Sequence, residues 1–422
     1  MTEQQPQQPA RQRPSTVLIR LLQLLLFGAG VIWACTQSGG HLDQMQVPGF
    51  LLALSVSWWL TPEIRARAMR LGLVDKPGEE RRIHKVAVPR LGGVALYISI
   101  IVALVVCMAI GGRWPKEGGL AGIAAGGTLI FVLGLLDDLE SIPAKIKFLV
   151  QILAACAAYS LGVRIQKLFT VPLSLDFLSF LPFIHSAPTQ SLVDLGPFAI
   201  FVTVLWLVGI ANAVNLIDGM DGLAAGVSAI AAVAIWAVAL TTVPGSHNAT
   251  PYPALIAAVL AGALVGFLRW NFNPARIFLG DSGAYLSGFI LGCLAVTGVM
   301  KKSTALLTLG LPLLILFFPL LDTCMAIVRR LARKQSPFTP DAEHIHHRLL
   351  RTGLSQKNVA YVIYTGSGIL GLIATWIVAR QAAITYLEIL GCIVGMAILF
   401  SEVLNRHRQR RGNLPLPDEP QD

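Results

Sequence analysis

The feature that most constrains the fold of this sequence is a series of apolar runs, each about as long as a bilayer is thick. Of the 422 residues, 55% are hydrophobic and only 13% are charged, which is too apolar for a soluble domain. Since a helix needs roughly 20 residues to cross a membrane, we expect an all-α, polytopic integral membrane protein with about 11–12 transmembrane helices. The expected spans lie at about 17–35, 48–64, 91–111, 120–136, 146–163, 197–214, 223–243, 253–270, 282–300, 303–328, 358–379 and 382–403.

The two ends of the chain differ from this membrane region. Residues 1–15 are rich in Gln, Pro and Arg and are expected to form a disordered cytosolic tail. Residues 16–36 read as an additional N-terminal span, although a cleaved signal peptide is the competing interpretation, because a basic stretch precedes an apolar one. The main membrane domain is expected at 48–404, followed by a basic and then acidic cytosolic tail at 405–422.

The net charge of +10 is mostly a topology signal. Basic residues gather in alternate connections, at 65–90, 145–147, 269–276, 329–351 and 406–411. By the positive-inside rule this side is cytosolic, and both termini lie there too. The chain is therefore expected in the cell inner (plasma) membrane with its active site facing the cytoplasm, and the charge gives no reason to expect a nucleic-acid partner.

Three other features predict little chemistry. The six cysteines lie inside apolar runs without CxxC spacing, so we expect neither disulfides nor metal ligands from them. On the non-cytosolic side, residues 164–196 are compatible with a short hairpin. The tripeptide Asn248-Ala249-Thr250 matches a glycosylation acceptor, but an unmodified loop is the favoured interpretation.

Five aspartates lie near predicted cytosolic ends of spans, where several carboxylates repel one another unless a cation joins them. Asp137 and Asp138 end one span, although a simple cap would also explain them. Asp218 and Asp221 are three residues apart and would share a face if helical, with Asn215 one turn earlier. The structural alternative for this second pair is a glycine-punctuated helix break capped by Asp.

The fifth aspartate, Asp281, lies in a Gly-Asp-Ser-Gly segment just before an apolar run. An ordinary helix N-cap would explain it. A helix N-terminus also favours phosphate, however, and the turn would present backbone N–H groups and a carboxylate to the same ligand. Phe278 could stack on a base or could pack in the core.

The segment AEHIHHRLL places three imidazoles and a guanidinium within five residues: His344, His346, His347 and Arg348. Such groups suit pyrophosphate oxygens, through charge-assisted hydrogen bonds. A zinc site is the rival interpretation, since three histidines can ligate zinc, but no HExxH-like spacing supports it. A solvated basic loop is the remaining alternative.

The motifs occur in the order DKPGEERRIHKVAVPRLGG, GLLDDL, NAVNLIDGMDGLAAG, NPARIFLGDSG and HIHHRLL. In this order the sequence resembles the polyprenyl-phosphate N-acetylhexosamine-1-phosphate transferase superfamily (glycosyltransferase 4 family) over about residues 48–404. Within it, the sequence is similar to the WecA/TagO-like branch, which makes polyprenyl diphosphate N-acetylglucosamine. The phospho-MurNAc-pentapeptide transferase branch (MraY) typically shows three consecutive histidines, which Ile345 interrupts here.

The resemblance implies an enzyme that needs Mg²⁺, with Mn²⁺ as an alternative ion, and that acts on UDP-GlcNAc and a polyprenyl phosphate lipid. It implies that Asp281 ligates the metal, with Asp218 as a second candidate ligand, and that Asp137 and Asp138 act on or position the lipid phosphate. It implies a place for Asp218 and Asp221 beside the nucleotide or metal. The further residues that it assigns to phosphates or substrate are Lys147, Asn215, Asn271, Phe278, His344, His346, His347 and Arg348. Asp322 also fits a family pattern without an assigned role, and a homodimer is expected by analogy.

The reaction expected from this resemblance is attack by the lipid phosphate on the sugar-bearing phosphorus of UDP-GlcNAc. A two-step route through an aspartyl phosphate on Asp137 or Asp138 is the mechanistic alternative. A cation-coupled transporter is the alternative from another class, because acids inside membranes often mark ion paths. Transport sites lie near the midplane, whereas these acids lie near span ends and only Asp322 is deep, so we favour the transferase.

Overall fold

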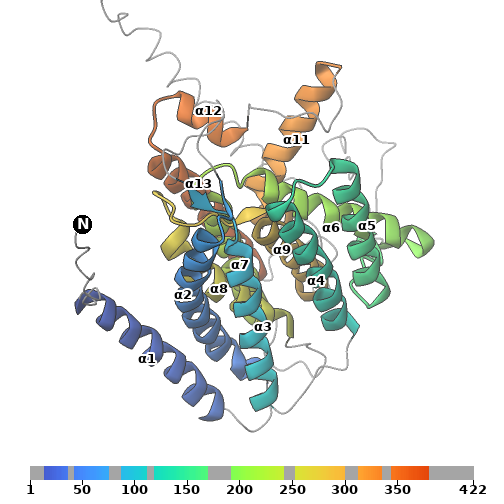
Figure 1. Cartoon of the computed structure of the whole chain (residues 1–422). Coiled ribbons are helices and arrows are strands. Elements are labelled where there is room, and N and C mark those ends of the chain that lie inside the picture. The colour runs from blue at the N-terminus through green and yellow to red at the C-terminus, as the bar shows by residue number, and fades with distance from the viewer. Residues whose placement is uncertain are drawn as a thin grey trace, which may run out of the picture.

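The computed structural model describes residues 14–36, 42–75, 87–111, 118–169, 192–241, 252–299, 312–334 and 344–379. Nearly all of the elements are helices (Figure 1). They are α1 (Pro14–Thr36), η1 (Leu42–Met45), α2 (Gln46–Arg70), α3 (Gly92–Gly111), α4 (Gly118–Leu139), α5 (Ala144–Ser160), η3 (Gly196–Phe198), α6 (Ala199–Leu216), α7 (Leu223–Thr241), α8 (Tyr252–Asn271), α9 (Gly280–Leu294), η4 (Ala295–Val299), α11 (Phe317–Ala332), α12 (Ile345–Arg351) and α13 (Gln356–Ala379).

The apolar runs of the sequence form these helices. Within the described residues, six helices are long and apolar enough to cross a membrane: Gly92–Gly111, Gly119–Leu139, Gly196–Leu216, Leu223–Leu240, Tyr252–Asn271 and Gln356–Val378. The all-α, multi-pass fold is thereby confirmed. The remaining predicted spans up to 303–328 coincide wholly or in part with α1, α2, α5, α9 and α11. The predicted span 382–403 lies outside the described residues. The same holds for Cys392, Asn248 and the two predicted tails, apart from residues 14 and 15.

Two short antiparallel hairpins accompany the helices. β1 (Val74–Asp75) pairs with β2 (Val88–Pro89), and β3 (Lys167–Phe169) pairs with β4 (Leu192–Asp194). The second pair lies within the 164–196 connection, where the sequence predicted a hairpin. Of the six cysteines, the five in the described part of the chain are free thiols.

The core is built around α8, which is buried along almost its whole length and packs against α2 and α7. Small residues let these helices approach closely. A side chain at Gly262 would collide with the backbone of Phe50 in α2. The additional N-terminal helix α1 lies at the edge of the bundle and packs on α2, where Arg20 pairs with Glu63 at 3.9 Å (Figure 1).

Polar side chains join the helices at only a few places inside the bundle. Gln151 of α5 and Asn212 of α6 form a reciprocal amide pair. Trp236 of α7 donates to Gln46 at the start of α2 over 2.6 Å. Because an amide in hydrocarbon needs a partner, each pair ties two helices together at a defined point.

Candidate active site

Four helix ends meet at one end of the bundle and bring together Asp137, Lys147, Asn215 and Asp281, which we call the carboxylate cluster. Asp137 comes from the last turn of α4, Lys147 from the first turn of α5, Asn215 from the last turn of α6 and Asp281 from the first turn of α9. The Lys147 ammonium forms ion pairs with Asp137 and, at 3.4 Å, with Asp281. Asn215 donates to the other Asp281 oxygen over 2.9 Å. Residues up to 144 positions apart in the sequence thus share one charged site.

Exposure distinguishes the two carboxylates that flank Lys147. The side chain of Asp137 is 5% exposed, and its Oδ1 atom accepts a bond from the backbone N–H of Ile142 at 2.8 Å. The side chain of Asp281 is 34% exposed and that of Lys147 is 24% exposed. A ligand therefore meets Asp281 and Lys147 before it meets Asp137.

Asp138, the neighbour of Asp137 in the sequence, has a different role. Its carboxylate caps the start of α9: Oδ1 accepts from the Asp281 N–H at 2.7 Å, and Oδ2 accepts from the Ser282 N–H and hydroxyl at 3.0 and 2.5 Å. These bonds satisfy donors that the first turn of a helix leaves unpaired. The sequence alternative for this pair was a cap for the span that it ends; the structure shows Asp138 capping a different helix, α9.

Glycines allow this cap to reach α9. A side chain at Gly134 in α4 would collide with the backbone of Ser282, and one at Gly93 would collide with Ser282 and Gly283. Gly280 has φ +75° and lies against the Arg90 carbonyl and the Asp138 carboxylate, where a Cβ has no room. The Gly-Asp-Ser-Gly segment is thus fixed by close backbone contact with α3 and α4.

Asp218 lies in a turn between α6 and α7, so the helical face that it would have shared with Asp221 does not form, and the chain has the glycine-containing helix break that was the alternative. α6 ends at Leu216, and Gly222, at φ +77°, has a backbone conformation that breaks the helix. Burial, and then the negative charges of Asp281, Asp138 and Asp221, raise the pKa of Asp218 well above its usual range, with Arg90 partly opposing them. Asp218 is therefore electrostatically part of the carboxylate cluster.

Asp221 holds the loop that follows α8. Its Oδ2 atom accepts from the Asn273 side chain and from the Ala275 N–H, each at 2.9 Å. Asn271 is also buried, and its amide donates to the Ile277 carbonyl within the same loop. The half-buried Phe278 pairs through its backbone with Pro89 and Gly92. The structure gives Asp221 and Asn271 loop-holding contacts, and substrate contacts for Asn271 and Phe278 stay a prediction.

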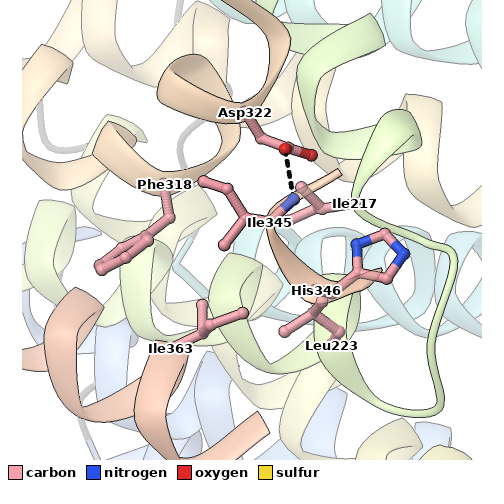
Figure 2. A pocket seen from close by; sticks show the side chains of 7 residues that line it. All are labelled: Ile217, Leu223, Phe318, Asp322, Ile345, His346 and Ile363. Atoms are coloured by element: carbon pink, nitrogen blue, oxygen red, sulfur yellow. Dashed lines mark hydrogen bonds between the residues drawn. The ribbon is translucent and has the colours of Figure 1, made fainter. Parts of the chain in front are cut away.

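The histidine segment, residues 344–348, forms the start of the short helix α12, and Asp322 of α11 holds it in place. One carboxylate oxygen of Asp322 lies 2.8 Å from His344 Nδ1, and the other accepts from the Ile345 N–H at 2.7 Å. Figure 2 shows this bond and places Phe318 and Ile363 on the side of Ile345 away from the His346 ring. Asp322, which the sequence left without a role, thus anchors the histidine segment, and its buried pair gives no support to an ion path.

His346 packs against the turn that carries Asp218. It is 2% exposed, and its ring occupies the place that a side chain at Gly219, the neighbour of Asp218, would take. Neither ring nitrogen has a hydrogen-bond partner among the described residues. Burial, followed by the nearby His347, lowers the pKa of His346 to about 4, so this imidazole is neutral at pH 7 and does not contribute the positive charge expected of it. His347 packs against it at 4.3 Å between ring centroids, and Arg348 is half-buried on the same helix.

Sequence reasoning missed the residues that position these groups. Ser282, Gly134 and Tyr364, whose hydroxyl donates to the Gly222 carbonyl at 2.6 Å, were not singled out. Ser282 lies within a motif that was noted, so its position beside Asp281 was the available signal. Tyr364 lies in an apolar run far along the chain and carries no such signal.

Comparison with known proteins adds to this geometry. Residues 120–299, which contain all five aspartates, match the family model described as glycosyl transferase family 4. A Bacillus subtilis protein named probable undecaprenyl-phosphate N-acetylglucosaminyl 1-phosphate transferase is 37% identical over 358 residues, covering 85% of this chain and 90% of the relative. The chain belongs to glycosyl transferase family 4.

Two further relatives also align with most of this chain. A Mycobacterium tuberculosis protein named decaprenyl-phosphate N-acetylglucosaminephosphotransferase is 33% identical and aligns over 90% of this chain and 92% of its own length. An Escherichia coli K12 protein named undecaprenyl-phosphate alpha-N-acetylglucosaminyl 1-phosphate transferase is 28% identical over 71% of this chain and 75% of its own length. The family resemblance seen in the motifs is confirmed.

Proposed function

We propose that this protein transfers N-acetylglucosamine 1-phosphate from UDP-GlcNAc to a polyprenyl phosphate, giving polyprenyl diphosphate N-acetylglucosamine and UMP. The observation that carries the proposal is Lys147 held between Asp137 and Asp281 at a site that four helix ends build. The names of the relatives support the acceptor and the sugar, and they do not favour the phospho-MurNAc-pentapeptide reaction.

The chemistry explains why such a site is needed. A lipid phosphate oxygen attacks the phosphorus that carries the sugar, a new P–O bond forms, and the P–O bond to UMP breaks with its electron pair on UMP. The sugar C1–O bond stays intact. Because nucleophile and donor are both anionic, charge repulsion dominates the barrier. Lys147 is placed to offset this charge, and Asn215 holds Asp281 in one orientation.

The residues of the site fit a hard divalent ion. Asp281 is more exposed than Asp137, and Asp218 lies in a field of negative charge that a cation would relieve. The described residues contain no group of three or more His, Cys, Asp or Glu that could hold a metal alone. Mg²⁺ typically takes one or two protein carboxylates and completes its shell with water and substrate phosphates, so two carboxylates would be enough. We infer that Asp281 and Asp218 hold Mg²⁺ (or Mn²⁺), which when bound neutralises phosphate charge.

The hydrogen bonds favour the one-step route. Both Asp138 oxygens accept bonds from the start of α9, and Asp137 is shielded by Lys147 and Ile142. Attack by either carboxylate would use an oxygen that already accepts a hydrogen bond, and these bonds would weaken as the aspartyl phosphate formed. Direct attack by the lipid phosphate needs no such rearrangement, because a phosphate monoester with a second pKa of about 6 is largely deprotonated near neutral pH.

The histidine segment completes the proposed site. His346 offers a neutral ring whose nitrogens are suited to hydrogen bonds with the donor, while Arg348 can contribute charge. The basic connections seen in the sequence support an orientation with this end in the cytoplasm and the protein in the inner (plasma) membrane. The homodimer expected by analogy stays a prediction.

The decisive experiment uses the purified full-length protein in detergent with UDP-GlcNAc, polyprenyl phosphate and Mg²⁺. We expect release of UMP that depends on both the lipid and the metal. The proposal fails if no UDP-N-acetylhexosamine releases UMP while Asp281→Asn leaves the activity of the protein in cells unchanged.

A further inference from the structure

One turn further into the bundle lies a second layer of polar residues, on three of the four helices that carry the carboxylate cluster. Gln151 follows Lys147 by four residues on α5, Asn212 precedes Asn215 by three on α6, and Tyr285 follows Asp281 by four on α9. Residues three or four apart lie on the same helical face. Each of these second-layer residues therefore lies directly below a residue of the cluster.

The two amides of this layer are bound to each other. The Asn212 Nδ2 atom donates to Gln151 Oε1 at 2.6 Å and to the Val208 carbonyl at 2.8 Å, and Gln151 Nε2 lies 3.5 Å from Asn212 Oδ1. Gln151 is 1% exposed, and the Tyr285 hydroxyl lies beside it. The short bond and the longer reciprocal contact both form only when the two side chains face each other, which limits the relative rotation of α5 and α6.

We propose that Gln151 and Asn212 are positioning residues for the transferase reaction: their amide pair sets the rotation of α5 against α6, and so aims Lys147 at Asp281 and Asn215. The proposal rests on the proposed function for its kinetic readout. Apolar side chains would pack at this point without fixing the rotation, because dispersion contacts have little directionality. A turn of one residue about the α5 axis moves a side chain by about 100°, enough to carry the ammonium out of the cluster.

The protein contains a matched control for a merely stabilising role. The Trp236–Gln46 hydrogen bond also joins two helices inside the bundle over 2.6 Å, and Gln46 is 6% exposed. It ties α2 to α7, and neither residue belongs to the carboxylate cluster or the histidine segment. Loss of this bond should lower stability without turning α5.

The test compares Gln151→Leu, Asn212→Leu, the double variant, the swapped pair (Gln151→Asn with Asn212→Gln) and the control Gln46→Leu. We expect each single α5–α6 variant to lower kcat on the order of 10-fold with a smaller change in KM, the double variant to add little, and the swap to recover most of the loss. Gln46→Leu should keep kcat. The proposal would be overturned if Gln151→Leu kept full kcat. It would also be overturned if Gln46→Leu and Gln151→Leu had the same thermal midpoint and lost kcat equally.

A readout without turnover separates this inference from the proposed function. A variant with the six native cysteines replaced and Lys147→Cys added carries one thiol at the start of α5. The rate at which a charged thiol reagent modifies this thiol reports the rotation of α5. We expect Gln151→Leu to change this rate several-fold and Gln46→Leu to leave it unchanged. An unchanged rate in Gln151→Leu would sink the inference even if the wild type released UMP, and a changed rate would support it even if UDP-GlcNAc were not the donor.

Discussion

The carboxylate cluster and the histidine segment approach the same site but are held in different ways. In the cluster, Asp137, Lys147, Asn215 and Asp281 hold one another through side chains from four separate helices. In the histidine segment, the carboxylate of Asp322 makes hydrogen bonds with the His344 ring nitrogen and with the backbone N–H of Ile345. The arrangement of the carboxylate cluster therefore depends on the balance of its charges, whereas the arrangement of the histidine segment depends on how its side chains pack.

The largest effect should follow loss of charge at Asp281. Asp281→Asn keeps the size of the side chain and can still accept from Asn215, but it removes the exposed negative charge and leaves Lys147 with one partner. We expect kcat to fall roughly 10³-fold, with a weaker dependence on Mg²⁺ concentration. UMP release measured across a Mg²⁺ titration checks this, and near-normal kcat at saturating Mg²⁺ would exclude a central role for the carboxylate.

A somewhat smaller loss is expected at the cation of the cluster. Lys147→Met keeps the length of the side chain but leaves Asp137 and Asp281 without the charge between them. We expect kcat to fall about 10²-fold, and Lys147→Arg to recover part of it. If Lys147→Met and Lys147→Arg gave the same rate, charge would not be the property that matters there.

Variants of Asp138 test whether the position of the turn that carries Asp281 matters as well as the charges of the cluster. Asp138→Asn presents an amide group to donors of Ser282, so the cap on α9 is lost in part, although the residue keeps its size. We expect kcat to fall about 10- to 100-fold, and Ser282→Ala to cause a smaller loss in the same direction, because both variants loosen the turn that carries Asp281. A normal rate in Asp138→Asn would mean that the cap is dispensable.

Gly219→Ala tests the shape of the histidine side. The added Cβ would lie 2.6 Å from His346 Nε2, so the ring must shift, yet no charge changes. We expect about a 10-fold loss of kcat/KM and a lower thermal midpoint, because a buried ring has to move to admit the Cβ. The double variant Gly219→Ala with His346→Ala should be no worse than His346→Ala alone, and additive losses would contradict the contact.

The last prediction concerns the pH dependence of stability and leaves the rate of the reaction aside. The pKa of His346 falls from about 6.5 in the unfolded chain to about 4 in the folded protein, so the unfolded chain binds a proton first as the pH drops. The folded state should therefore lose up to about 1.4 kcal/mol per pH unit between pH 6.5 and 4 through this residue. The groups acting on it are His347, Asp322 and His344. Thermal midpoints in detergent should depend less on pH in His346→Gln than in the wild type, and equal slopes would argue against a buried neutral ring.

The sequence predicted the membrane fold well, because apolar runs of bilayer length have few alternatives. It also placed Asp137 and Asp281 at span ends on one predicted side, whereas Lys147 was assigned to the site only through the family resemblance. It could not separate the tasks of Asp137 and Asp138. Adjacent positions give the same pattern, and the cap that Asp138 provides belongs to a helix some 140 residues further along. Asp322 and Gln151 were beyond reach for the same reason, because their partners are set by tertiary contacts.

The first turn of α9 has a consequence for motion during the reaction. It is clasped by the Asp138 carboxylate on one side and by the glycine surfaces of α3 and α4 on the others, with backbone lying against backbone. A packed joint of this kind is a fixed point and not a hinge. The Asp218–Gly222 turn meets the short helix α12 differently, because there the backbone of Gly219 lies against a side chain, the His346 ring. The first turn of α9 is therefore the rigid support of the site, on which Asp281 keeps its position.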